Sequence, residues 1–125
     1  MELLTAEALA EAREAVESFI RRCEAAQGKF PAGSSQHSLL RNRLEALQVS
    51  RALIEARLGG GDGATAEELA AALPPVGSIL HKCRAAQAKY APGSAQYDRF
   101  ERMVRPMRLV KALIEEALAE TGLSL

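Results

Sequence analysis

The side chains with the most evident chemical potential lie in two segments that repeat one motif. Residues 23–36 read Cys-Glu-Ala-Ala-Gln-Gly-Lys-Phe-Pro-Ala-Gly-Ser-Ser-Gln, and residues 83–96 read Cys-Arg-Ala-Ala-Gln-Ala-Lys-Tyr-Ala-Pro-Gly-Ser-Ala-Gln. A serine-capped helix start beside basic side chains is a natural setting for a phosphate or carboxylate group. The candidate ligand-binding residues are Gln27, Lys29, Ser34, Gln36 and Arg41 in the first copy and Gln87, Lys89, Ser94, Gln96 and Arg99 in the second.

The same polar residues also have a structural explanation, which the residue types favour. Glutamine and lysine can satisfy the last carbonyls of a helix, and serine can cap the helix that follows. Gly33 and Gly93 permit the sharp reversal of the chain between them. The motif therefore predicts a locked turn at least as well as it predicts a ligand site.

No set of residues in the chain supports catalysis or metal binding. The soft metal ligands are Cys23, His37, His81 and Cys83, and helical geometry places His81 and Cys83 about 200° apart around one helix. No paired zinc-ligand spacing, glycine-rich phosphate loop or nucleophilic triad is present. We expect a protein that is not an enzyme and has no cofactor or metal, with Cys23 and Cys83 as free thiols inside an apolar seam.

The motifs belong to a longer internal duplication, because residues 5–58 reappear as residues 65–118 without a gap. Apolar residues recur at steps of three and four in each copy, which predicts two helices joined by the motif turn. One hairpin cannot bury its apolar face alone, so the two copies should cover each other. We predict an all-α fold: a four-helix bundle of two tandem hairpins with approximate two-fold symmetry.

Residues 1–125 should form a single domain in which a glycine-rich linker, residues 59–64, joins the two repeats. Exchange of hairpins between two chains would satisfy the same pattern. Pro74 and Pro75 replace Glu14 and Ala15 of the first copy, and proline suits the first turn of a helix but not its interior. The third helix is therefore predicted to be interrupted, with a short turn at residues 66–72 and a longer helix from Pro75.

The charges are sorted along the hairpins although the formal net charge is zero. Residues 21–43 carry five basic side chains and one acid, and residues 82–105 carry six and two, which gives the turn ends a summed charge of +8. In an up-down-up-down bundle both turns would lie at one basic end. A neutral chain with 4% aromatic residues argues against specific nucleic-acid binding, and no apolar run suits a membrane.

The leading functional hypothesis is a small helical-repeat protein, cytoplasmic and bacterial, that acts as a non-catalytic protein-interaction module. Its partner would be another protein or a second copy of itself, including a homodimer. The alternative is a binder of a small anionic or phosphorylated ligand at the basic end formed by the two hairpin turns.

Overall fold

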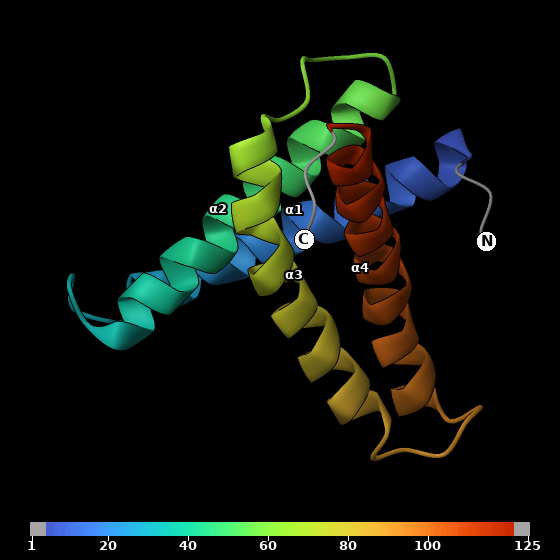
Figure 1. Ribbon diagram of the computed structural model, residues 1–125. Helices are drawn as coiled ribbons and strands as arrows, with labels where there is room; N and C mark the ends of the chain where they lie inside the picture. Colours follow the sequence, from blue (N-terminus) through green and yellow to red (C-terminus); the bar gives the residue numbers. More distant parts are fainter. Residues whose placement is uncertain (1–4, 122–125) are drawn as a thin grey trace.

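The computed structural model describes residues 5–121, and these residues form four helices and no strand (Figure 1). The helices are α1 (Ala6–Gln27), α2 (Ser35–Arg57), α3 (Ala66–Gln87) and α4 (Ala95–Glu120). The helices α1 and α2 form one hairpin, and α3 and α4 form the other. The predicted all-α class is confirmed. None of the described helices has an apolar stretch that could cross a membrane.

The helix starts are fixed by side-chain caps at the predicted positions. The Thr5 hydroxyl accepts the amide of Ala8 at 3.0 Å, and the Thr65 hydroxyl accepts the amide of Glu68 at 3.1 Å. The Glu68 carboxylate in turn accepts the amide of Thr65 at 2.8 Å, which completes a capping box at the start of α3. Each cap satisfies a backbone donor that has no partner inside its helix.

The predicted interruption of the third helix is wrong, because α3 runs continuously through Pro74 and Pro75. The two prolines deprive the carbonyls of Ala70 and Ala71 of their usual amide donors. Pro74 and Ala71 are exposed, so water can reach this side of the helix. The neighbouring Ala72 and Val76 are buried in the core, and their packing holds the helix on both sides of the proline pair.

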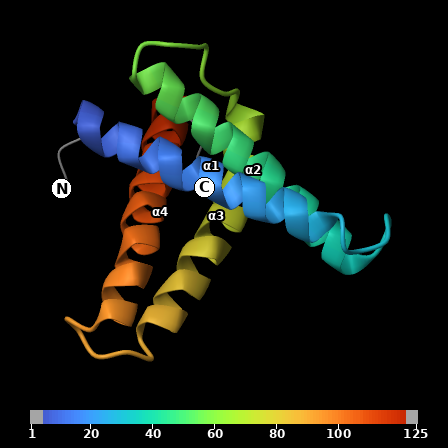
Figure 2. The same cartoon turned by 180° about the vertical axis from the view of Figure 1, so that it is seen from behind.

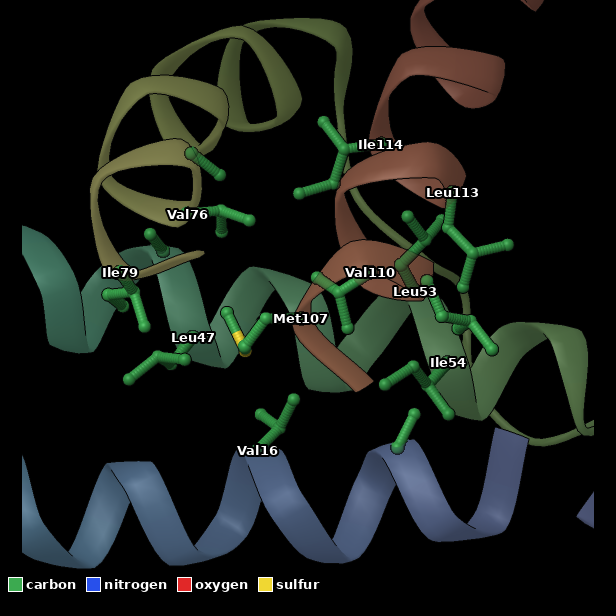
Figure 3. Packing of buried hydrophobic residues seen from close by; sticks show 14 of the residues in the cluster. Val16, Leu47, Leu53, Ile54, Val76, Ile79, Met107, Val110, Leu113 and Ile114 are labelled. Carbon is green, nitrogen blue, oxygen red and sulfur yellow. The ribbon is translucent and has the colours of Figure 1, made fainter. Parts of the chain in front are cut away.

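The core lies where the two hairpins meet and draws residues from all four helices (Figure 3). Val16, Leu47, Met107 and Ile114 come from α1, α2 and α4 and are completely buried. Val76 of α3 faces the same cluster. Complete burial of such a side chain stabilises the fold by about 1.5–3 kcal/mol.

The hairpins cross each other instead of lying side by side along their whole length (Figures 1 and 2). In both views the turn between α1 and α2 and the turn between α3 and α4 lie at separate extremities. The prediction that both turns form one basic end is therefore wrong. The reason is that each hairpin packs against the other along the part away from its turn, from Leu9 and Leu69 to Ile54 and Leu118, and its turn extends beyond the crossing.

The distribution of buried residues shows where each hairpin leaves the core. The first buried residue of α2 is Ala46 and the first of α4 is Val104, although these helices begin at Ser35 and Ala95. Phe30 and Tyr90 continue the apolar seam in the sequence, but they are 39% and 40% exposed. The turn sections are only two helices thick, so no second layer covers these aromatic rings.

Candidate functional site

The two projecting ends of the hairpins hold all of the candidate ligand-binding residues. We call residues 21–43 the first tip and residues 82–105 the second tip. Each tip contains the end of one helix, a turn and the start of the next helix. The structure thus divides the ten candidate residues into two sets of five that do not meet (Figure 1).

The serines of the motif are structural caps. The Ser34 hydroxyl accepts the amide of His37 at 3.2 Å and donates to the carbonyl of Pro31 at 2.8 Å. The Ser94 hydroxyl likewise accepts the amide of Tyr97 at 3.1 Å. The preceding glycines, Gly33 and Gly93, have φ angles of 88° and 90°, a conformation that favours glycine. The serine oxygens are thus occupied by the turn itself.

The glutamines of the motif tie the two helices of each tip together. Gln87 donates from Nε2 to the Tyr97 carbonyl at 3.3 Å and to a carboxylate oxygen of Glu101 at 2.8 Å. Gln27 makes one longer bond, 3.5 Å from Nε2 to the His37 carbonyl. In both tips the carbonyl acceptor, His37 or Tyr97, lies in the first turn of the following helix, not at the end of the preceding one as expected. The glutamines act as braces across the turn.

The remaining candidates are exposed at the surface of the tips. Lys29, Arg41, Lys89 and Arg99 are exposed and form no ion pair within residues 5–121. Gln36 and Gln96 are exposed beside them, and the Gln36 side chain accepts from the Ser35 hydroxyl at 3.3 Å. The two turns lie at separate extremities of the molecule (Figure 2), so the cations of one tip do not meet those of the other.

Exposed apolar side chains accompany the cations. The large apolar residues that are exposed in the described chain are Phe30, Leu39 and Tyr90, and all three lie in the tips. The Tyr90 ring stacks on Phe100 with a centroid separation of 5.9 Å and an interplanar angle of 17°. Leu40 occupies the position equivalent to Phe100, so the Phe30 ring has no aromatic partner there. The first tip therefore lacks an aromatic pair and has a second exposed apolar side chain, Leu39.

The cysteines are free and buried, as the sequence predicts. Burial raises the pKa of the Cys23 thiol, and the charge of Arg43 opposes that shift. Burial likewise raises the pKa of the Cys83 thiol, opposed by Arg22. A raised pKa leaves little thiolate near neutral pH, and thiolate is the nucleophilic form. This arrangement suits packing and not thiol chemistry.

The structure also shows a groove between α2 and α3 that the sequence analysis missed. The groove has a volume of about 580 Å³, and its α2 side includes Glu45, Val49 and Ala52. Its α3 side includes Ala71 and the proline pair, residues 74–75. The sequence carries one signal for this groove, which is that small residues and prolines lie on the sides of α2 and α3 that line it. That signal becomes informative only when α2 and α3 are known to be neighbours.

Neither protein-family models nor characterised proteins nor solved structures gave a match to this chain in the three comparisons. Its chemistry must therefore be judged from its own surface. Within residues 5–121 no three histidine, cysteine or carboxylate side chains gather at one point where they could hold a metal ion.

Proposed function

We propose that the chain is a non-catalytic protein-interaction module, built from two tandem repeats of a helical hairpin, that binds partner proteins through its tips. The observation that carries this proposal is the concentration of exposed apolar residues and unpaired cations at the two projecting turns. Aromatic and arginine side chains are enriched at protein interfaces, and the exposed large apolar residues of the described chain all lie in the tips.

The partner surface should be acidic around an apolar centre. Each tip sums to a charge of +4 in the sequence, and this charge attracts and orients an acidic surface at long range. Phe30 and Tyr90 then supply the apolar contact at the centre. The Arg57–Glu116 ion pair, at 3.3 Å, lies at the opposite ends of the hairpins and leaves the tip cations available.

The two tips permit binding at two points by one molecule. Because the tips are parts of rigid hairpins joined by a common core, a partner with two matching sites would gain affinity from the fixed separation. The buried free thiols fit a reducing compartment such as the cytoplasm. The alternative, binding of a small anionic ligand at one basic end formed by both turns, is less favoured because the two turns lie apart.

Site-specific photocrosslinking in living cells tests the proposal. A photoreactive phenylalanine analogue in place of Phe30 or Tyr90 should give crosslinked products with other proteins, whereas the same analogue at exposed Ser78, outside the tips, should not. High salt applied before illumination of a cell extract should reduce the tip products. Equal labelling at all three positions, or none, would refute the proposal.

A further inference from the structure

The residues that line the groove between α2 and α3 indicate what kind of molecular surface could bind there. Most of the groove's lining is apolar, with Val49 and Ala52 on one side and Ala71 and the proline pair on the other, and Asn42 and Gln48 add uncharged polar groups. Glu45 and Glu68 line its margin, and no basic side chain of residues 5–121 lines it. An occupant that complements it would combine an apolar body with positive charge.

The proline pair also changes the hydrogen bonding of a residue that lines the groove. Pro75 cannot donate to the carbonyl of Ala71, so this oxygen keeps acceptor capacity that a regular helix would use. Glu68 is held in place by its bond to the Thr65 amide. The groove therefore offers two carboxylates and the Ala71 carbonyl, which suit the ammonium or guanidinium group of a basic side chain.

The first tip of this same protein has the complementary composition. Phe30 is 39% exposed and Leu39 is 48% exposed, and these two residues provide an apolar body. Lys29 and Arg41 lie beside them, exposed and without an ion-pair partner within residues 5–121. The second tip is less suited because Tyr90 already stacks on Phe100 and because Arg99 replaces Leu39.

The tip cannot enter the groove of its own chain. Helix α2 is continuous from Ser35 to Arg57, so it carries the first tip at its start and one wall of the groove along its middle. Ser35, at the start of α2, lies ten residues before Glu45 of the groove, which is about 15 Å along the helix, and Phe30 lies beyond that start. The tip also points away from the crossing of the hairpins (Figures 1 and 2). Only a second molecule can bring the two surfaces together.

We infer that the first tip of one copy docks into the α2–α3 groove of a second copy, with Phe30 and Leu39 against its apolar residues and Lys29 and Arg41 near Glu45 and Glu68. The inference depends on the proposed function of the tips as binding surfaces and names a second copy as one partner. A two-fold arrangement lets each molecule give its tip and receive the other, so the contact closes into a dimer.

Sedimentation velocity of the full chain over a range of concentrations tests this inference. The wild type should pass from monomer to dimer with increasing concentration, and high salt should shift the equilibrium toward monomer. Ala71→Trp, which fills the groove, should raise the dimer Kd by about tenfold or more. Glu11→Trp is the matched control, because Glu11 is exposed at the equivalent position of α1.

The tip is tested in the same way. Phe30→Ser should weaken the dimer by at least about tenfold, whereas Tyr90→Ser, its counterpart in the second tip, should leave the dimer Kd unchanged. Lys29→Glu and Glu45→Lys should each weaken association, and the chain that carries both should recover part of it, because the opposite charges face each other again. Circular dichroism checks that each variant remains helical.

Three results would overturn the inference. These are a wild type that stays monomeric at all concentrations, a dimer insensitive to both Ala71→Trp and Phe30→Ser, or equal weakening by Phe30→Ser and Tyr90→Ser. Failure of this inference is distinguishable from failure of the proposed function. A monomeric protein whose positions 30 and 90 still crosslink to other proteins keeps the proposed function, and a protein without any tip-specific product keeps neither.

Discussion

The glutamine brace of the second tip gives a quantitative prediction through the variant Gln87→Ala. Gln87 is 7% exposed, and its Nε2 donates to the Tyr97 carbonyl and to the Glu101 carboxylate. A bond to a charged acceptor contributes about 1.5–3 kcal/mol, and a neutral bond contributes about 0.5–1.5 kcal/mol. Glu101 can turn to water after the substitution, so we expect a net loss of about 2 kcal/mol.

The first tip supplies the matched control, Gln27→Ala. Gln27 makes a single bond of 3.5 Å, at the long limit for a hydrogen bond, so its removal should cost only about 0.5 kcal/mol. Urea unfolding followed by far-ultraviolet circular dichroism measures both variants, provided that the transition is two-state and that the m-value is unchanged. Equal losses for the two variants, or a larger loss for Gln27→Ala, would refute the brace as the cause.

Three further predictions concern the caps, the thiols and the core. Thr65→Ala should cost about 1–2 kcal/mol by urea unfolding, more than Thr5→Ala, because only Thr65 belongs to a capping box. Burial raises the pKa of Cys23 and Cys83 above the ordinary 9.0, so their contribution to stability is full below pH 9.0 and is lost as the pH rises through the folded pKa. Alkaline urea titrations should show this loss in the wild type and not in Cys23→Ala/Cys83→Ala, and an identical pH dependence would contradict it. Ile54→Ala should cost about 2–5 kcal/mol because Ile54 is completely buried, and a loss below about 1 kcal/mol would show that the core is loosely packed there.

The proline pair, residues 74–75, is a place where a prediction from local sequence alone is wrong. The rule that proline ends a helix concerns one residue and its preceding turn, and it predicts an interruption at residues 74–75. The observed helix is continuous because the lost bonds fall on an exposed side while Ala72 and Val76 pack in the core. Which side of α3 faces water depends on how the other helices pack against it. The rule that proline ends a helix does not take this packing into account.

The sequence by itself determined the two helical hairpins, the caps of their helices at threonine and serine, the glycine reversals and the burial of both cysteines, but not the continuity of α3. These features depend on residues within a few positions of each other or on a period of 3.6 residues, and both can be read directly from the chain. The tertiary structure alone decided that the hairpins cross, that the two tips lie apart, that Phe30 and Tyr90 are exposed, and that a groove separates α2 from α3. These features depend on how side chains distant in sequence pack where the hairpins meet. A periodic apolar seam fixes which face of a helix is buried, but it does not fix the angle at which that helix crosses its partner.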